Sequence, residues 1–178
     1  MTSSEFPSPL YGSRLKLTLF LNSDITHEYL LWLNDPLVTK YSNQRFLRHS
    51  VETSTAFLNG FKGTNSLFLS IRVTDSNAMI GTMTAYLNQD HQTGDMGLLI
   101  GRRDLWGLGY GQEAWNALGT WLLETRKLRK LTAGTASENL GMRRIMERFG
   151  MHHEATKERQ EIIDGFPQDL VFYAKFRS

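Results

Sequence analysis

A run of glycines, Trp106-Gly107-Leu108-Gly109-Tyr110-Gly111, is the stretch of this sequence whose residue types point most directly to binding chemistry. It follows an apolar run at 94–101 that is typical of a buried strand, and it precedes a run with helical periodicity. A strand that passes through glycines into a helix leaves uncrowded backbone N–H groups at a helix N-terminus, and this geometry binds anions. The segment therefore predicts a phosphate site. A tight turn that merely needs glycine dihedrals stays open as the alternative.

The spacing of these glycines narrows the kind of anion. A P-loop carries Lys-Ser/Thr directly after its last glycine, whereas Gln112 and Glu113 stand there. The dinucleotide-binding fingerprint needs a third glycine at position 112 and a βαβ unit near the start of the chain, and this sequence has neither. The pyrophosphate of coenzyme A is not excluded in this way. A nucleotide-binding fold unrelated to acetyl-CoA is kept as an alternative, because it predicts stabilisation by ATP or NAD and not by CoA.

The composition excludes several other classes of protein. The 20 basic and 18 acidic residues are spread along the chain, so no block of charge predicts a nucleic-acid arm or a polybasic membrane anchor. The chain has no cysteine, which rules out disulfides, thiolate metal sites and a covalent cysteine intermediate. The adjacent His152 and His153 would point to opposite faces of a strand, so we expect no metal. No stretch reaches the roughly 18 to 20 apolar residues of a membrane span, and we expect a cytoplasmic protein without membrane or nucleic-acid partners.

The elements that must position the glycine segment follow from the hydropathy pattern. A chain of 178 residues fills one core, so we expect a loose lead-in at 1–12 and a single domain at 13–178. Apolar patterns predict strands at 14–20, 67–73, 79–86, 94–101, 128–135, 151–163 and 170–176. Helical patterns predict helices from Ser23 or Asp24 to Leu33, from Ser50 to Phe61, from 109 to 126, and from an N-cap at Ser137 to Phe149. The expected fold class is α+β, a mostly antiparallel mixed sheet of about seven strands flanked by about four helices.

A second motif follows the glycine segment and runs as Asn139-Leu140-Gly141-Met142-Arg143-Arg144-Ile145-Met146-Glu147-Arg148-Phe149-Gly150-Met151. Together the two motifs resemble the GNAT N-acetyltransferases, in the branch of the ribosomal-protein N-terminal acetyltransferases and the amino-sugar acetyltransferases of bacterial surface-polysaccharide pathways. The family's Gln/Arg-x-x-Gly-x-Gly/Ala motif maps onto 106–111, with Trp106 in the Gln/Arg position. Its Asn-x-x-Ala/Ser motif maps onto Asn139 and Met142, and the stretches 29–36 and 41–45 also look like this branch.

The resemblance implies an acetyl-CoA-dependent N-acetyltransferase with a GNAT-like sheet, in which the strand at 94–101 and a strand near 131–136 splay apart. The pantetheine arm of the cosubstrate would lie between them and pair with main-chain groups of Leu98, Leu99 and Ile100. The pyrophosphate would lie on Trp106, Gly107, Leu108, Gly109, Tyr110 and Gly111. Asn139 would contact the pantetheine or the acceptor, with a helix cap as its alternative role. Arg144 would reach the adenosine 3′-phosphate, and a solvated helix face explains this arginine equally well.

Acetyl transfer from a thioester to an amine needs an unprotonated amine and a route for the thiolate to leave. Asp95 and His91 are the candidate general bases, each with a solvated turn as its alternative. Family members often place a tyrosine near the sulfur as general acid, and the corresponding position here holds Met146. Ser137 is the candidate substitute, although a helix N-cap is the favoured reading of this serine. A thiol is a tolerable leaving group, so the missing acid need not abolish activity.

The acceptor is not identified by the sequence. A polar and aromatic cluster in a loop suits recognition of a sugar or nucleotide, with ordinary loop packing as the alternative, and it comprises Tyr41, Asn43, Gln44, Arg45 and Phe46. The leading hypothesis is transfer of acetyl from acetyl-CoA to a primary amine by direct attack in a ternary complex. The acceptors considered are an amino sugar, nucleotide-linked or free, and a protein N-terminus. A non-catalytic acyl-CoA-binding or regulatory module is the alternative function, and a homodimer is the candidate assembly.

Overall fold

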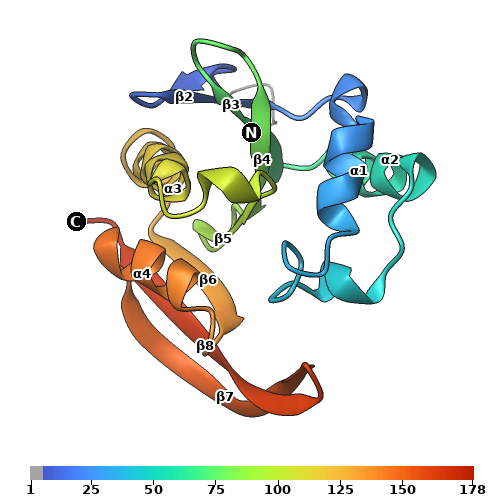
Figure 1. The fold of residues 1–178 in the computed structure, drawn as a ribbon. Coiled ribbons are helices and arrows are strands. Elements are labelled where there is room, and N and C mark those ends of the chain that lie inside the picture. The colour runs from blue at the N-terminus through green and yellow to red at the C-terminus, as the bar shows by residue number, and fades with distance from the viewer. Residues whose placement is uncertain (1–5) are drawn as a thin grey trace.

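The computed structural model describes residues 6–178 and places helices on both faces of one mixed sheet (Figure 1). Within this range the sheet has eight strands in the order β1-β2-β3-β4-β5-β6-β8-β7, and only the β5–β6 pair is parallel. The strands are β1 (Leu10–Tyr11), β2 (Leu15–Leu19), β3 (Leu67–Val73), β4 (Met79–Asn88), β5 (Thr93–Ile100), β6 (Lys130–Ala136), β7 (His152–Ile163) and β8 (Phe166–Phe176). The α-helices are α1 (His27–Leu33), α2 (Val51–Asn59), α3 (Tyr110–Thr120) and α4 (Leu140–Arg148). The expected α+β fold class is confirmed.

The two faces of the sheet are covered by different helices. On one face, apolar side chains of the strands pack with Trp115 of α3 and Met146 of α4 in the main core. On the other face, Phe68 of β3 stacks on Phe20 and lies in a second core with Tyr29 of α1. Successive side chains of a strand point to opposite faces, so each strand contributes to both layers. Helices α3 and α4 therefore pack in one hydrophobic core, and helices α1 and α2 lie over a second one on the opposite face of the sheet.

β5 and β6 run side by side only over a short stretch. Their register begins with Thr93 opposite Lys130 and ends with Asp95 opposite Thr132. Beyond this point β5 stays paired with β4 and β6 stays paired with β8, so the two strands diverge. The sheet therefore has a V-shaped opening in its middle, with Asp95 and Thr132 at the vertex. The divergence that the family resemblance implied for these strands is confirmed.

Residues 6–12 do not form a loose lead-in. Leu10–Tyr11 is the short strand β1 paired with β2, and Phe6 is buried with its ring edge against Trp121, 5.1 Å between ring centroids. The prediction for this part of 1–12 is wrong because a two-residue strand is too short to show a hydrophobic period. This strand also raises the strand number above the expected seven. Residues 1–5 lie outside the described residues.

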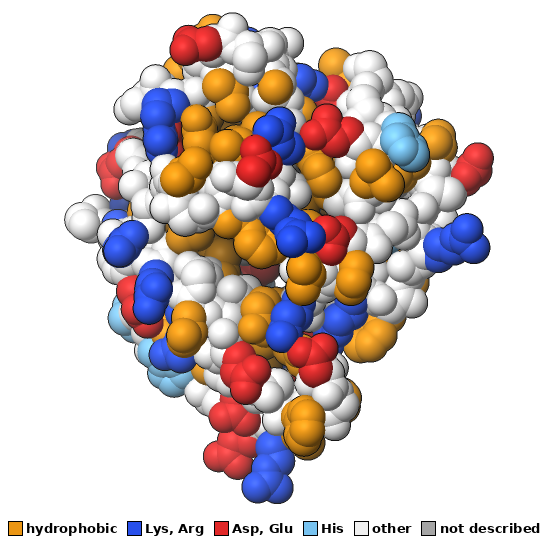
Figure 2. Space-filling model, viewed as in Figure 1, with side chains coloured by type: hydrophobic (Ala, Val, Ile, Leu, Met, Phe, Trp, Pro, Cys, Tyr) orange, Lys and Arg blue, Asp and Glu red, His pale blue; other side chains and the backbone are white. Residues whose placement is uncertain are grey.

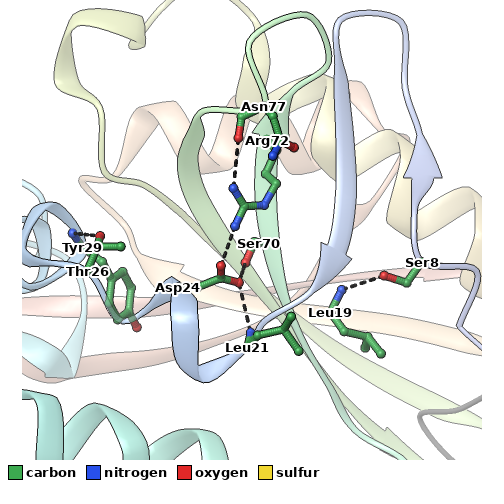
Figure 3. Close-up of polar contacts among 9 residues, drawn as sticks. All are labelled: Ser8, Leu19, Leu21, Asp24, Thr26, Tyr29, Ser70, Arg72 and Asn77. Carbon is green, nitrogen blue, oxygen red and sulfur yellow. Dashed lines mark hydrogen bonds and ion pairs between the residues drawn. The ribbon is translucent and has the colours of Figure 1, made fainter.

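Asp24 does not cap the first long helix. Thr26 is the N-cap of α1, because its hydroxyl accepts a backbone N–H of the first turn. Asp24 lies in a short 3₁₀ turn and is buried, and its carboxylate accepts hydrogen bonds from the Ser70 hydroxyl (2.6 Å), the Leu21 N–H (3.0 Å) and the Arg72 guanidinium (Figure 3). Burial of a carboxylate requires such partners. This network joins the start of α1 to β3 and so fixes α1 over the sheet.

Two further helix boundaries differ from expectation. Asn139, not Ser137, caps α4, since its Oδ1 accepts the Met142 N–H at 3.2 Å. The helix expected at 109–126 is α3 followed by a π-helical turn at Trp121–Thr125, which wraps the end of the helix around the core. No helix of the described residues is long and apolar enough to cross a membrane.

Candidate active site

One large cavity runs through the V-shaped opening. Its volume is about 1480 Å³, above the roughly 300–1,000 Å³ of a typical small-molecule site. We call the part lined by residues 96–148 the loop lobe and the part lined by residues 29–86 the helix lobe. Figure 2 shows a hollow in the middle of this face, with apolar side chains inside it and both basic and acidic side chains around it. A cavity of this size has room for two ligands that meet at the V.

The glycine segment forms one end of the loop lobe. Gly107 and Gly109 have φ of +76° and +87°, in the left-handed region that favours glycine. The backbone N–H groups at the start of α3 donate to no acceptor within residues 6–178 until Glu113, which bonds to the Gly109 carbonyl at 3.0 Å. The free donors are those of Gly107, Gly109, Tyr110, Gly111 and Gln112. Five free donors at a helix N-terminus form a cradle for an anion such as pyrophosphate.

Arg14 holds this loop from outside, and nothing near it in the chain marks it for this role. Its guanidinium donates to the Glu113 carboxylate (2.9 Å) and the Leu108 carbonyl (3.1 Å) and lies over the Tyr110 ring. The Arg14 N–H also donates to Glu113. Partial burial opposes ionisation of Glu113, but the hydrogen bonds from Arg14 outweigh it and lower the pKa of this carboxyl. Arg14 lies 94 residues before Leu108, so only the fold brings the two together.

Trp106 and Leu108 contribute to the shape of the loop. The Trp106 indole N–H donates to the carbonyl of Ile100, the last residue of β5, at 2.8 Å, and the residue lines the cavity. Its side-chain donor is therefore occupied by the protein. Leu108 does not line the cavity, and its side chain is exposed. Of the residues expected to bind the cofactor, Leu108 alone lies outside the cavity wall.

The edges of the V provide main-chain groups to the cavity. Leu98, Leu99 and Ile100 line it, and along this part of β5 the edge facing β6 has no strand partner in the described chain. Unpaired strand edges bind extended amide-containing ligands. Gly97 also lines the cavity, and a Cβ there would lie 2.6 Å from the hydroxyl of its β4 partner Thr84, so this position has no room for a side chain.

α4 contributes both a capping residue and cations to the loop lobe. Asn139 lines the cavity, caps α4 and donates to the Thr135 hydroxyl at 3.0 Å, so its two expected roles coexist. Arg144 lines the cavity and is exposed, and so is Arg148 one turn later. Arg143 turns away and donates to the Tyr173 hydroxyl. The loop lobe therefore combines free N–H groups with two arginines that have no ion-pair partner within residues 6–178.

Asp95 lies at the vertex of the V but not in the cavity wall. It faces Tyr86 across β4, and Tyr86 lines the cavity. Its carboxylate accepts a hydrogen bond from the Thr132 hydroxyl at 2.7 Å. Crowding by protein atoms raises the pKa of Asp95, and the bond from Thr132 offsets part of that effect. A carboxyl with a raised pKa beside a cavity has the character of a general base, acting here through water.

The other catalytic candidates are not brought to the cavity. His91 lies in the exposed turn between β4 and β5, at the opposite end of β5 from the glycine segment. Ser137 lies between β6 and α4, where its carbonyl accepts from Arg143 (3.1 Å), and it does not line the cavity. Met146 is fully buried in the main core. Neither His91 nor Ser137 is placed to exchange a proton with a ligand in the cavity, and Met146 has no proton to exchange.

The cluster expected to bind the acceptor divides between two roles. Tyr41 and Gln44 line the helix lobe. Asn43 and Arg45 do not. Arg45 instead forms an ion pair with Glu161 of β7 at 3.3 Å and donates to the Ile162 carbonyl at 3.1 Å. Loop packing is thus the role that the structure gives to Arg45.

Three residues of the helix lobe were missed by sequence analysis. Tyr29 and Ser54 read as ordinary helix positions, and His49 reads as part of a loop, because nothing local links them. Burial raises the pKa of the Tyr29 hydroxyl far above its ordinary value. The Nε2 of His49 lies 3.0 Å from the Gln44 carbonyl, which can only accept, so Nε2 carries the proton. All three line the cavity.

The described residues contain no group of three or more His, Asp or Glu side chains placed to hold a metal ion. Comparison with known proteins supplies the context for the site. The family model of the acetyltransferase (GNAT) domain matches residues 14–152. No curated protein sequence matches the chain significantly.

Three solved structures illustrate the likeness of the fold. A GNAT-family acetyltransferase from Bacillus anthracis has 22% identity and a TM-score of 0.79, covering 95% of this chain and 98% of that one. The ribosomal L7/L12 α-N-protein acetyltransferase RimL, in complex with coenzyme A, has 16% identity and a TM-score of 0.83, with 95% and 98% covered. Spermidine N-acetyltransferase from Vibrio cholerae, in complex with CoA and spermine, has 16% identity and a TM-score of 0.83, with 92% and 96% covered. At these identities the likeness shows the fold.

The family match spans most of the chain and includes the glycine segment, the V and all of α4. The protein therefore belongs to the GNAT acetyltransferase family and is an acetyl-CoA-dependent N-acetyltransferase.

Proposed function

We propose that the protein transfers acetyl from acetyl-CoA to a primary amine by direct attack in a ternary complex, with an amino sugar or a protein N-terminus as acceptor. The observation that carries this proposal is the single cavity that joins two lobes through the V. The loop lobe fits coenzyme A, because it offers five free N–H groups for the pyrophosphate and an unpaired strand edge for the pantetheine amides. Arg144 and Arg148 are available to the 3′-phosphate.

The helix lobe then receives the amine. The amine lone pair attacks the thioester carbonyl carbon, a C–N bond forms, and the C–S bond breaks as the thiolate leaves. A main-chain N–H of Leu98 or Leu99 at the open edge of β5 stabilises the oxyanion that develops on the carbonyl oxygen. Asp95 accepts the amine proton through water. The chain has no cysteine to carry the acyl group, so the transfer takes place in one complex.

Thiol release from acetyl-CoA in the presence of a panel of amines tests this function. We expect turnover with at least one amine, and thermal stabilisation by CoA but not by ATP or NAD. Binding of CoA without turnover of any amine would favour the non-catalytic acyl-CoA-binding module. Stabilisation by ATP or NAD alone would favour a nucleotide-binding protein that does not use acetyl-CoA.

A further inference from the structure

The wall of the helix lobe is rich in hydroxyl groups. They come from α1, α2 and β4 and belong to Tyr29, Ser54, Thr82, Thr84 and Tyr86. The Thr53 hydroxyl on the same wall is already bonded to the Ser50 backbone. A hydroxyl can both donate and accept, so this wall suits a ligand that itself carries several hydroxyls. Ser54 is the most informative of them. It is 4% exposed, and its Oγ has no hydrogen-bond partner within residues 6–178. A buried hydroxyl without a partner lowers stability, and a ligand hydroxyl at this position would satisfy it.

The charged side chains that line the helix lobe are basic. Among the described residues that line it, none is Asp or Glu, whereas Lys40 and Arg48 are cations. Lys40 is paired with Asp164 at 2.8 Å, and Arg48 has no ion-pair partner in the described chain. The carboxyl beside this lobe is Asp95, whose raised pKa reflects an environment that disfavours its charge. A polycationic amine finds no countercharge here, and an anionic group finds Arg48.

The helix lobe is also bounded on its outer side. Arg45 joins the segment 37–49 to Glu161 and to the Ile162 carbonyl of β7, and Lys40 joins it to Asp164 in the hairpin turn. Two hydrogen bonds between Asn34 and the backbone of His49, both at 3.0 Å, hold the other end of this segment on α1. A segment held at both ends gives this side of the lobe a fixed wall.

We propose that the acceptor is an amine with several hydroxyls and an anionic group, which is the chemistry of an amino sugar that bears a phosphate, alone or as part of a nucleotide. The Ser54 hydroxyl bonds to a hydroxyl of the sugar, and the Arg48 guanidinium binds the phosphate. This assignment rests on the proposed function, because the helix lobe receives the acceptor only if coenzyme A occupies the loop lobe.

Steady-state kinetics with five amines tests the assignment. The probes are glucosamine 6-phosphate, UDP-glucosamine, glucosamine, spermidine and a short peptide with a free N-terminal serine. We expect kcat/KM for the better phosphate-bearing sugar to exceed that of each other class by about tenfold or more. The two phosphate-bearing probes separate a sugar phosphate from a nucleotide-linked sugar.

Two variants locate the recognition in the helix lobe. Arg48→Gln is expected to raise KM for the phosphate-bearing sugar about tenfold and to remove its advantage over glucosamine, with KM for acetyl-CoA unchanged. Lys62→Gln is the matched control, because this exposed lysine loses the same charge beyond the end of α2 and does not line the cavity. Ser54→Ala is expected to lower kcat/KM for the sugars without lowering Tm, since its hydroxyl has no protein partner to lose.

The outcomes separate this assignment from the proposed function. Preference for spermidine or the peptide, or an Arg48→Gln enzyme that keeps the phosphate advantage, overturns the assignment and leaves the acetyltransferase standing. Failure to acetylate any amine, although CoA binds, overturns both.

Discussion

Asp95 lies where the parallel strands part, with its carboxylate bonded to Thr132 and its neighbour Tyr86 in the cavity wall. If it accepts the amine proton, Asp95→Asn lowers kcat/KM by about 10²- to 10⁴-fold, the usual contribution of a general base. The fall of kcat/KM at low pH should disappear as well, because in the wild-type enzyme this fall would come from protonation of the Asp95 carboxyl. Full activity of Asp95→Asn with an unchanged fall at low pH would exclude this role. His49→Gln, which alters the imidazole in the helix lobe, is the variant to examine in that case.

The same aspartate makes a prediction about stability. The pKa of Asp95 in the folded protein is raised above its value in the unfolded chain. Its favourable contribution to the free energy of unfolding is therefore present below the unfolded pKa and is lost as pH rises through the folded pKa. At neutral pH the shift therefore lowers stability only slightly, because Asp95 is exposed and solvent screens its charge. We expect Asp95→Asn to raise Tm slightly at pH 7, with the difference disappearing near pH 4, the ordinary range of an aspartate. Thermal melts at the two pH values check this, and a lower Tm for the variant at pH 7 would contradict it.

The backbone conformation of the glycine segment leaves the N–H groups of its glycines free to donate to a ligand. Gly107 has φ of +76° and open space around a built Cβ, so Gly107→Ala adds only backbone strain, about 1–2 kcal/mol. The strained loop should bind pyrophosphate less well, and we expect KM for acetyl-CoA to rise about tenfold. Gly63→Ala is the matched control, since Gly63 has φ of +72°, equally open space and no place in the cavity wall. If Gly107→Ala and Gly63→Ala raised KM for acetyl-CoA equally, the glycine segment would have no specific role in binding the cosubstrate.

Arg14 is the side chain that supports this element. A lysine cannot reach the Leu108 carbonyl and the Glu113 carboxylate together, because it lacks the forked geometry of guanidinium. Arg14→Gln and Arg14→Lys should therefore both raise KM for acetyl-CoA, by several-fold to about tenfold, while kcat changes less. Titration of CoA binding by calorimetry provides the measurement. Complete rescue by the lysine variant would mean that charge alone, and not loop position, is what Arg14 supplies.

At the scale of the whole molecule, contacts between the β7–β8 hairpin and the segment 37–49 hold the outer wall of the helix lobe in place. Arg45→Gln breaks the ion pair with Glu161, so we expect KM for the acceptor to rise several-fold and KM for acetyl-CoA to stay constant. Lys130→Gln breaks a more exposed ion pair, which joins β6 to Glu154 of β7 and does not line the cavity, and should change neither KM. A change in KM for acetyl-CoA in the Arg45→Gln enzyme would show that the two lobes are coupled through the fold.

The features that could be predicted from the sequence are local in the chain. The glycine segment and most strands are marked by spacing or period within a few residues, whereas Asn139 was indicated only by the resemblance to the family motif. Arg14, Ser54 and His49 could not, because each reaches the site from another element and carries no distinctive neighbour. Asp24 looked like a helix cap for the same reason, since its partners Ser70 and Arg72 lie on β3. β1 was too short to show a period.

A crystal structure with coenzyme A bound would test where the cosubstrate lies. We predict pyrophosphate oxygens within about 2.7–3.2 Å of the backbone nitrogens of Gly107, Gly109, Tyr110, Gly111 and Gln112. The pantetheine arm should lie in the V beside Leu98 and Leu99, with the sulfur directed toward the helix lobe. Coenzyme A bound with its pyrophosphate away from the start of α3, or with its thiol outside the V, would contradict the account.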